Sequence, residues 1–429
     1  MLPINKIYNM DCLEGMKLID DNSIDSIVTD PPYELGFMGK KWDSTGIAYN
    51  VELWQEALRV LKPGGHLLAF GGTRTYHRMV CAIEDAGFEI HDQIQWIYGS
   101  GFPKSMDISK AIDKKFGVER EIIGQREDIL KKQAKDLREG KRKIVDSLNA
   151  GANERNNGFV TVSADITTPT TDEAKQWDGW GTCLKPANEP IVVARKPLSE
   201  KTVAENVLKW GTGGINIDDC RIPLQEHGED KRLGGNGNWK TEKMAKNVYE
   251  GGYEGKSVTS SKLGRFPANI IFDEVAGKIL DEQTGILTSG KMKQHIEGGT
   301  YNVYSKMYPR YVETIGDSGG ASRFFFNVEQ DDLEDLIPFF YCAKASKKER
   351  GEGNTHPTVK PLKLISYLIT LVTPPTGICL DIFEGSGTHA LACIENGFKY
   401  IGFELDKHYF DIATKRISNH HEQLKIVGD

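Results

Sequence analysis

Long apolar runs, paired cysteine motifs and an excess of positive charge are all absent from this chain of 429 residues. No stretch approaches the length of a membrane span, and residues 1–6 lack the apolar core of a signal peptide. The seven cysteines are odd in number and nowhere form C-x-x-C. This pattern argues against a zinc site or a disulfide framework and fits a reducing cytoplasm. We therefore expect a cytoplasmic protein with no membrane partner and no metal.

The charge balance also limits the choice of partners. The formal net charge is −7, so the chain is not a general polycation. Contacts with phosphates dominate the affinity of proteins for nucleic acid, so such a partner would need a local basic face. The hydrophobic share of 39% and the charged share of 27% are typical of globular proteins. The length is enough for about two to three domains.

Strand-like and helix-like segments alternate over the first hundred residues. Apolar runs predict strands at 6–9, 24–29, 66–70 and 93–97. Helical spacing of apolar residues predicts helices at 13–19, 53–61 and 76–87, the second closed by Pro63-Gly64-Gly65. Residues 34–50 are glycine-rich and predict a loop. The alternation predicts an α/β fold with a doubly wound, mostly parallel sheet.

The sequence Asp30-Pro31-Pro32-Tyr33 directly follows the second predicted strand, where open α/β sheets bind their ligands. The two prolines remove two backbone donors, so nearby carbonyls stay free to accept hydrogen bonds. Asp30 adds an acceptor and Tyr33 adds a flat aromatic face. This set fits a planar group with an exocyclic amine, such as the edge of adenine or cytosine. A proline-rich turn with a solvated aspartate is the alternative.

The middle of the chain is less regular. Residues 105–180 are polar and contain a basic cluster made of Lys131, Lys132, Lys135, Arg138, Lys141, Arg142 and Lys143. This cluster fits either a solvated helix face or a set of phosphate contacts. A strand is expected at 189–194. Residues 228–264 and 285–320 have the composition of loops that become ordered on binding a partner.

Regular structure returns near the C-terminus. His356-Pro357-Thr358-Val359-Lys360-Pro361 precedes an amphipathic helix, for which Thr358 is the expected N-cap. A strand at 377–381 then leads into a Gly-Ser-Gly turn and a helix from His389. Such a turn lets the backbone approach a ligand and presents helix N–H groups. The next strand ends at Glu404, which could hold ribose hydroxyls. Since no Walker lysine follows, we expect a nucleoside-type cofactor without a pyrophosphate.

Together and in this order, these motifs resemble those of the β-class amino-group DNA methyltransferases, of the phage or prophage type. Residues 185–190 and 265–269 resemble the same type. The resemblance covers 4–100, 183–197 and 340–417 well. It implies a seven-stranded, Rossmann-like methyltransferase sheet, circularly permuted, with an inserted target-recognition region. The implied divisions are a catalytic half at 1–104 and 183–197, a basic insert at 105–182, a target-recognition region at 198–340 and a cofactor half at 341–429.

The resemblance also implies a role for each motif. The cofactor would be S-adenosylmethionine and the substrate double-stranded DNA. Asp30 and the Pro31 carbonyl would hold the amine of a flipped base, Tyr33 would stack on that base, and Pro32 completes the catalytic motif. The predicted cofactor contacts are Asp11 and Cys12 at the adenine, Glu404 at the ribose, His356, Thr358 and Lys360 at the methionine end, and the loop residues Asp381, Phe383, Gly385, Ser386, Gly387 and Thr388.

Some positions depart from the family pattern or stay open. Ile382 replaces a common proline, Glu384 places a carboxylate in the loop, and His389 stands where a small residue is frequent. Trp96 fits either an aromatic position near the target base or the core. With DNA as substrate, the candidate phosphate contacts are Lys131, Lys132, Arg138, Lys141, Arg142, Lys143, Lys347, Lys348 and Arg350. A homodimer is compatible with the resemblance.

The resemblance favours adenine N6 as the target, because the tetrapeptide begins with aspartate. Cytosine N4 is the main alternative. A methyltransferase for RNA or for protein glutamine is a second one, although those enzymes usually have the cofactor loop before the tetrapeptide. A catalytically silent DNA-binding relative is a third, and it would be expected to carry a damaged motif.

Overall fold

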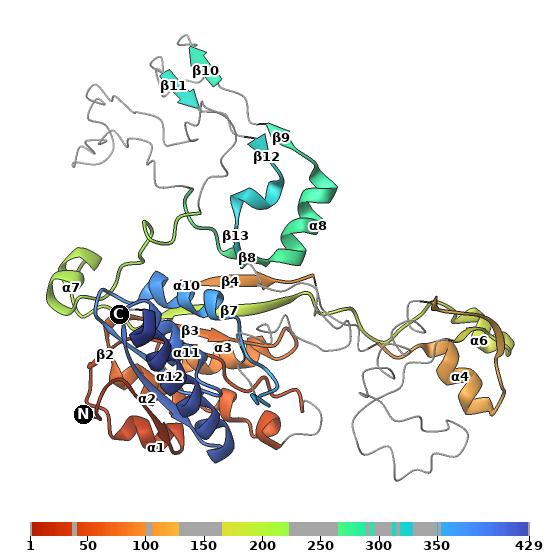
Figure 1. Cartoon of the computed structure of the whole chain (residues 1–429), viewed down its shortest axis with the longest axis horizontal. Coiled ribbons are helices and arrows are strands. Elements are labelled where there is room, and N and C mark those ends of the chain that lie inside the picture. Colours follow the sequence, from red (N-terminus) through yellow and green to blue (C-terminus); the bar gives the residue numbers. More distant parts are fainter. Residues whose placement is uncertain are drawn as a thin grey trace. The chain divides into compact units, whose positions relative to one another are not determined.

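The computed structural model describes residues 2–36, 41–99, 105–127, 165–222, 265–288, 292–295, 311–314, 318–328, 350 and 353–427 (Figure 1). These residues form two compact units. The larger unit combines Met1–Gly101 with Ala187–Asp429, and the smaller unit is Phe102–Pro186. Within the described ranges, no helix has both the length and the apolar character that a membrane crossing requires.

The larger unit is built on a nine-stranded sheet with the order β1-β15-β14-β2-β3-β7-β4-β8-β13. Strand β7 is antiparallel to both neighbours, and the other pairs are parallel. The predicted mostly parallel α/β sheet is therefore confirmed. The strands are β1 (Lys6–Asn9), β2 (Ile24–Thr29), β3 (Leu61–Phe70), β4 (Glu89–Ile97), β7 (Asn188–Arg195), β8 (Ile270–Asp273), β13 (Phe326–Val328), β14 (Ile378–Asp381) and β15 (Lys399–Glu404).

The strand count differs from the expected seven. The extra strands are β8 and β13, which come from the region predicted to recognise the target and pair beyond β4. Both are short, and β8 alone carries an evident apolar run, Ile270-Ile271-Phe272. Their membership in the sheet depends on pairing with β4, which their own sequence does not encode.

Helices cover both faces of this sheet (Figure 1). Side chains of successive strand residues point to opposite faces, so Val28 joins one core cluster and Ile27 the other. Helices α10 (Leu362–Val372), α11 (Thr388–Glu395) and α12 (Lys407–Val427) pack on the Val28 side. Helices α1 (Cys12–Lys17), α2 (Val51–Val60) and α3 (Tyr76–Asp85) pack on the Ile27 side. The doubly wound arrangement predicted from the alternation is thus present.

The order of the strands brings the two ends of the chain together. Strand β14 pairs in parallel with β2, with Cys379 opposite Ser26 and Leu380 opposite Ile27. The carboxyl ends of these strands therefore lie side by side. Thr29 Oγ1 donates to Asp381 Oδ1 over 2.6 Å, although the two residues are 352 positions apart in the sequence. The tetrapeptide and the Gly-Ser-Gly loop follow these two strand ends.

Three local predictions were wrong. Helix α2 ends at Val60, and Pro63-Gly64-Gly65 lies inside β3, where the pairing with β2 shifts register. Thr358 is not an N-cap, because α10 begins at Leu362 after Pro361, with no side-chain cap. Residues 34–50 contain two short 3-10 turns, η2 (Lys41–Ser44) and η3 (Ile47–Tyr49), rather than an irregular loop alone. Trp96 is fully buried in the core, in line with the second of its two interpretations.

The smaller unit holds more regular structure than its polar composition suggested. It contains α4 (Ile108–Phe116), β5 (Glu121–Gln125), β6 (Asp165–Thr168) and α6 (Asp172–Gln176), with β5 and β6 antiparallel. Asp113 is buried and accepts hydrogen bonds from Arg120, Thr170 and Thr171. A charged centre of this kind leaves no apolar periodicity in the sequence. The basic cluster at 131–143 and the predicted loop at 228–264 lie outside the described residues.

In the larger unit, the remaining helices with described bounds are α7 (Val203–Trp210) and α8 (Glu274–Thr284). Helix α7 begins with a capping box between Thr202 and Glu205. Short pairs, β9 (Leu287–Thr288) with β12 (Ser318–Gly319) and β10 (Met292–His295) with β11 (Tyr311–Thr314), fall within 285–320, where a loop was expected. A 3-10 turn, η5 (Ala321–Phe324), precedes β13.

Candidate active site

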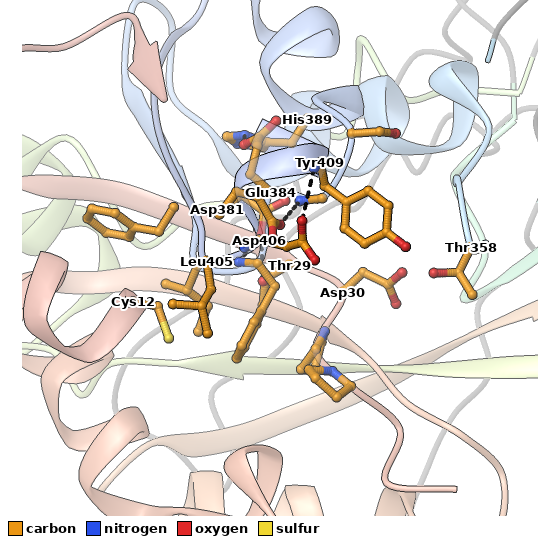
Figure 2. A pocket seen from close by; sticks show the side chains of 18 of the residues that line it. Cys12, Thr29, Asp30, Thr358, Asp381, Glu384, His389, Leu405, Asp406 and Tyr409 are labelled. Carbon is orange, nitrogen blue, oxygen red and sulfur yellow. Dashed lines mark hydrogen bonds and ion pairs between the residues drawn. The ribbon is translucent and has the colours of Figure 1, made fainter. Parts of the chain in front are cut away.

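A cavity of about 480 Å³ opens at the carboxyl ends of β1, β2, β14 and β15 (Figure 2). Its volume is in the range of small-molecule sites. The structure brings together in its lining all the predicted catalytic and cofactor residues except Gly387, which is the N-cap of α11. Those residues are Asp11, Cys12, Asp30, Pro31, Pro32, Tyr33, His356, Thr358, Lys360, Asp381, Phe383, Gly385, Ser386, Thr388 and Glu404.

The glycine loop turns sharply between β14 and α11. Gly385 and Gly387 have φ values of +59° and +87°, which side chains other than glycine rarely adopt. A Cβ atom on Gly387 would lie 3.0 Å from the Cβ of Ala413 on α12. Arg416 of α12 donates to the carbonyl and hydroxyl of Ser386. The loop is therefore held close to α12 by both steric fit and hydrogen bonds.

Glu404 ties the end of β15 to this loop. Its Oε2 accepts from Gly385 N over 2.8 Å, and its Oε1 accepts from Asp406 N over 2.7 Å. Burial raises the pKa of Glu404 to about 7. A carboxylate has further lone pairs, so Glu404 can still accept from a ligand hydroxyl in the cavity.

Asp381 and Asp11 each fix the end of a strand. Asp381 Oδ1 accepts from Thr29 and from Phe383 N, and burial, followed by the charge of Glu384, raises its pKa to about 7. Asp11 is the N-cap of α1 and accepts from Leu13 N over 2.9 Å. Both carboxylates thus accept hydrogen bonds from the protein itself. For both of them, a contact with the cofactor was predicted.

The tetrapeptide Asp30-Pro31-Pro32-Tyr33 is bonded to a lysine and a glutamate from distant parts of the chain. Lys360 Nζ lies 2.5 Å from Asp30 Oδ2, 3.2 Å from Tyr33 OH and 3.4 Å from Glu189 Oε2. The Tyr33 hydroxyl donates to Glu189 Oε2 over 2.8 Å. Lys360 is only 6% exposed and Glu189 only 1%. A buried ammonium thus lies between two carboxylates, which is the pairing that buried charges require.

The second carboxylate oxygen of Asp30 differs from the first in that it lacks a partner. Asp30 Oδ1 is buried and has no hydrogen-bond partner among the described residues. Buried polar atoms are nearly always paired, and Asp30 is a residue of the cavity lining, so its unpaired oxygen is a candidate acceptor for a ligand donor. The geometry around Asp30 therefore suits a ligand N–H group.

Glu189 is the residue of this network that the sequence analysis missed. It stands in β7, between Asn188 and the apolar run Pro190-Ile191-Val192. Two signals were available: a carboxylate at the start of a strand buried on both faces is unusual, and Glu189 lies within 185–190, a segment that resembles the family but was given no role. Its partners could not be identified, since they come from residues 156 positions away, as in the case of Tyr33.

His356 also lines the cavity, and its ring packs against that of Tyr409. Their ring centroids are 4.4 Å apart, with an interplanar angle of 71°. Burial, with a contribution from Lys360, lowers the pKa of His356 to about 3, so the imidazole is neutral at physiological pH. Figure 2 shows Tyr409, Asp30 and Thr358 together in the lining. Tyr409 and Asp406 were not predicted, because Tyr409 lies in α12 and Asp406 in the short segment before it, outside any motif.

The candidate DNA contacts are for the most part outside the described residues. Of the nine basic residues predicted, the structure describes only Arg350. Its guanidinium donates to the carbonyl of His356 over 2.5 Å, so it supports the segment that leads to Lys360. The predicted phosphate contacts remain predictions.

Comparison with known proteins places the site in context. A family model described as DNA methylase (N6_N4_Mtase) matches residues 24–415. The type II methyltransferase M2.LlaDCHI of Lactococcus lactis subsp. cremoris is 32% identical over 124 residues, or 27% of this chain and 46% of that protein. The type II methyltransferase M.HpaI of Haemophilus parainfluenzae is 32% identical over 110 residues, or 24% of this chain and 34% of that protein. The chain thus spans less than half the length of these curated relatives.

Solved structures give more distant matches. The crystal structure of the M1.HpyAVI–SAM complex aligns with 96% of this chain and 98% of that chain, at 15% identity and a TM-score of 0.36. The PvuII DNA methyltransferase (cytosine-N4-specific) aligns with 95% of this chain and 84% of that chain, at 12% identity and a TM-score of 0.42.

Proposed function

This chain belongs to the DNA methylase family, and from that premise we propose that it transfers a methyl group from S-adenosylmethionine to the exocyclic amine of a base in double-stranded DNA. Adenine N6 is the preferred target and cytosine N4 the alternative. The observation that carries the proposal is the unpaired, buried Oδ1 of Asp30 in the cavity wall. The prediction that the chain is of the phage or prophage type, which was inferred from residues 185–190 and 265–269, stays a prediction.

The amine chemistry explains the acceptors. The lone pair of an exocyclic amine is conjugated with the ring, so the nitrogen is a poor nucleophile. Asp30 Oδ1 and the Pro31 carbonyl would accept its two N–H groups and concentrate electron density on nitrogen. S-adenosylmethionine would supply the methyl group: the nitrogen would bond to that carbon as its bond to sulfur breaks, with S-adenosylhomocysteine as the leaving group. The nitrogen would then release one proton to solvent water, which restores the neutral amine.

Lys360 has a different role in this proposal from the one predicted for it. A contact with the cofactor's carboxylate was expected, but its ammonium is already paired with Asp30 and Glu189. We propose that Lys360 holds Asp30 by its Oδ2 atom and so leaves Oδ1 to accept from the amine. Glu189 in turn fixes Lys360 and the Tyr33 hydroxyl. The Tyr33 ring is then held for stacking, which contributes about 1–3 kcal/mol per base in other proteins.

The cofactor would occupy the part of the cavity lined by the glycine loop. Glu404 would accept from the ribose hydroxyls, and Asp11 with the backbone of Cys12 would contact the adenine. Phe383, Ser386, Thr388, His356 and Thr358 line the same cavity as Asp30. S-adenosylmethionine held there would supply the methyl group, and alignment of two reactants in one site can contribute roughly 7–11 kcal/mol.

The DNA substrate requires further contacts. The target base must leave the duplex, at a cost of a few kcal/mol. We propose that the insert at 105–182 provides phosphate contacts and that 198–340 recognises the target sequence. A homodimer and a cytoplasmic location are parts of the same proposal.

The decisive experiment is incubation with unmethylated DNA and labelled S-adenosylmethionine, followed by mass spectrometry of the nucleosides. N6-methyladenine is the expected product, and N4-methylcytosine would support the alternative. Asp30→Ala should abolish the product while the affinity for S-adenosylmethionine stays measurable. Methylated RNA or glutamine without methylated DNA, or undiminished turnover by Asp30→Ala, would overturn the proposal.

A further inference from the structure

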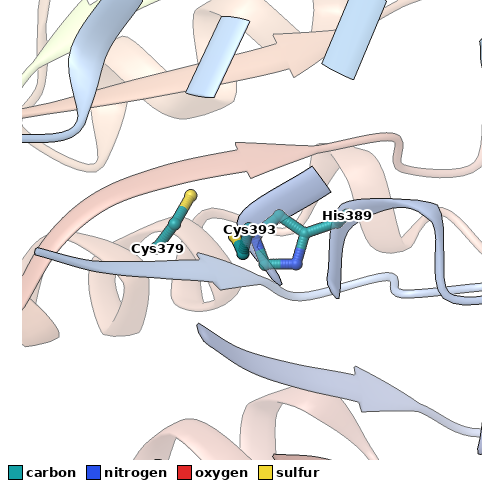
Figure 3. A group of neighbouring side chains, drawn as sticks. All are labelled: Cys379, His389 and Cys393. Atoms are coloured by element: carbon teal, nitrogen blue, oxygen red, sulfur yellow. Dashed lines mark hydrogen bonds between the residues drawn. The ribbon is translucent and has the colours of Figure 1, made fainter. Parts of the chain in front are cut away.

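A cluster of two thiols and an imidazole lies beneath the glycine loop (Figure 3). Cys379 belongs to β14, and His389 and Cys393 belong to α11, on opposite sides of the loop in the sequence. His389 and Cys393 are four residues apart, so they lie on one face of the helix. The ligand atoms of the three residues all lie within 4.8 Å of one another, and each residue is at most 3% exposed.

The imidazole is oriented by a carboxylate. His389 Nδ1 lies 3.0 Å from Glu384 Oε2, and Nε2 lies 3.6 Å from Cys393 Sγ. Glu384 is itself fixed, because its Oε1 accepts from Ala390 N over 3.0 Å. Histidines that bind metals usually donate their second ring N–H to such a carboxylate, which sets the tautomer and the ring orientation. Here that arrangement leaves Nε2 facing the two sulfur atoms.

We propose that Cys379 Sγ, His389 Nε2 and Cys393 Sγ bind a zinc ion. Zinc prefers sulfur and nitrogen ligands in tetrahedral geometry, with bonds of about 2.3 Å to sulfur and 2.0–2.1 Å to nitrogen. Those bond lengths place a sulfur and a nitrogen ligand about 3.5 Å apart. The observed separation of 3.6 Å between Nε2 and Cys393 Sγ matches this value.

Charge balance supports a dication at this place. Binding would release the protons of both thiols, and two thiolates neutralise the charge of zinc. The ion and its three protein ligands would then carry no net charge, which suits their burial. Since His389 lines the cavity, water from the cavity would be the fourth ligand.

A second set of ligands shares the same histidine. Asp381, Glu384 and His389 also lie within 4.8 Å of one another. Both carboxylates already have partners, since Asp381 accepts from Thr29 and Phe383 N, and Glu384 accepts from Ala390 N. They therefore serve as outer partners, while the sulfur atoms are the ligands that zinc prefers.

This inference departs from the expectation that the chain binds no metal. That expectation rested on the absence of C-x-x-C, whereas the cluster has the spacing C-x9-H-x3-C. It also accounts for two departures from the family pattern, Glu384 and His389, because the carboxylate of Glu384 orients the imidazole of His389. The ion would fasten β14 to α11 on either side of the cofactor loop. The inference does not depend on the proposed methyl transfer.

The test uses the full chain purified under reducing conditions and dialysed against a chelator resin after exposure to zinc. Elemental analysis should find about one zinc ion per chain. Cobalt in its place should give the thiolate-to-cobalt charge-transfer absorption and the visible bands of tetrahedral coordination. Cys379→Ser and Cys393→Ser should lose both signals. Cys220→Ser is the matched control, since Cys220 is equally buried but bonds to the Tyr367 carbonyl.

X-ray absorption at the zinc edge of the unmodified protein needs no variant and covers the case in which the serine variants fail to fold. Two sulfur neighbours at about 2.3 Å are expected. A shell of oxygen and nitrogen alone would overturn the proposal. So would a folded protein that binds S-adenosylmethionine but retains no zinc, in which case the cluster is a buried hydrogen-bonded network only. Loss of zinc from Cys220→Ser as well would place the ion elsewhere.

Discussion

At the scale of single residues, the proposed catalytic motif depends on side chains outside it. Lys360 comes from the segment before α10 and Glu189 from the start of β7, and both reach the tetrapeptide. Since Lys360 touches Asp30, Tyr33 and Glu189, one buried cation links the proposed acceptor of the amine to the ring proposed to stack on the base. Replacement of any member leaves another charged group buried without its partner, which is costly.

We predict that Glu189→Gln lowers kcat about ten- to hundredfold. The substitution keeps the shape of the side chain but removes its negative charge, which pairs with Lys360 and accepts a hydrogen bond from the Tyr33 hydroxyl. A hydrogen bond to a charged group contributes about 1.5–3 kcal/mol. The KM for S-adenosylmethionine should change little, because Glu189 lies on the base side. Single-turnover kinetics with saturating cofactor measure the effect. Glu89→Gln is the control, since Glu89 pairs with Arg195 on the exposed part of β4. An unchanged rate would remove Glu189 from the mechanism.

Glu404 should make cofactor binding depend on pH. A ribose hydroxyl donates to the charged carboxylate, and burial raises the pKa of Glu404 to about 7. Affinity should therefore be full above pH 7 and fall below it, by up to about tenfold per pH unit. 5′-Methylthioadenosine is the suitable ligand, because it lacks an ionisable amino-acid tail. Calorimetric titration between pH 5.5 and 8.5, a range of about three units around that pKa, measures the effect.

The variant Glu404→Gln distinguishes the contribution of Glu404 to the pH dependence from that of Asp381, whose pKa is raised to a similar value. It should bind more weakly at pH 8 and show a flatter profile. It should also be more stable than the parent protein at pH 8 without cofactor. The reason is that a carboxyl with a raised pKa stabilises the fold only below its unfolded pKa, and this contribution is lost as pH rises through 7. A profile identical to that of the parent would exclude Glu404 as the ribose acceptor.

At the scale of elements, the strands and helices near the cavity were largely predictable because their apolar periodicity is strong. Strands β1 and β2 fall where they were expected, and β2 ends at Thr29 as predicted. The errors arose where a local signal was overridden. Pro63-Gly64-Gly65 has the composition of a helix stop, yet pairing with β7 and β2 draws it into β3. Thr358 had a suitable side chain for a cap, but Pro361 delays the helix.

The glycine loop allows backbone strain and close packing to be measured separately. Gly387 and Gly397 both have positive φ, but a Cβ on Gly387 would meet Ala413 at 3.0 Å whereas one on Gly397 would meet nothing within 4 Å. Gly397→Ala should cost about 1–2 kcal/mol of stability from strain alone. Gly387→Ala should cost about 1–3 kcal/mol more, because α12 must move.

Urea unfolding and the affinity for S-adenosylmethionine provide the two measurements. Gly387→Ala should weaken cofactor binding strongly, since it displaces Ser386 and Gly385 from the cavity wall. Gly397→Ala should leave the affinity within about twofold, because it lies at the far end of α11. Equal losses of affinity in the two variants would mean that the loop conformation is not what holds the cofactor.

At the scale of the whole molecule, the order of the motifs in the sequence allowed the site to be predicted, whereas the contacts between distant segments did not follow from it. Strands β2 and β14 each end in a recognisable motif, and an open parallel sheet brings such ends to one edge. The sequence contains no comparable sign that β8 and β13 extend the sheet, or that Glu189 meets Lys360. These are packing outcomes that depend on the fold being complete.

The smaller unit provides the last prediction. It leaves the larger unit between β4 and β7, which are antiparallel neighbours with Ile97 opposite Asn188, and Tyr98 N donates to the Ala187 carbonyl over 2.9 Å. The chain ends at the point of excision are therefore already close. Replacement of 102–186 by a short glycine-serine turn should leave the sheet and the cofactor cavity intact, and the affinity for S-adenosylmethionine should stay within about twofold, because a short hairpin loop suits such strands.

DNA binding should respond differently. If the basic cluster at 131–143 contacts phosphates, the shortened protein should bind DNA more weakly at every sequence. Each lost contact should also reduce the slope of log affinity against log salt by about 0.9. Fluorescence anisotropy with cognate and random duplexes over a range of salt measures both quantities. Substitution of Lys141, Arg142 and Lys143 by glutamine in the intact chain is the control that removes charge without removing the unit. A salt slope that is the same in all three proteins would assign the cluster to a solvated surface, and the phosphate contacts would then have to come from the larger unit.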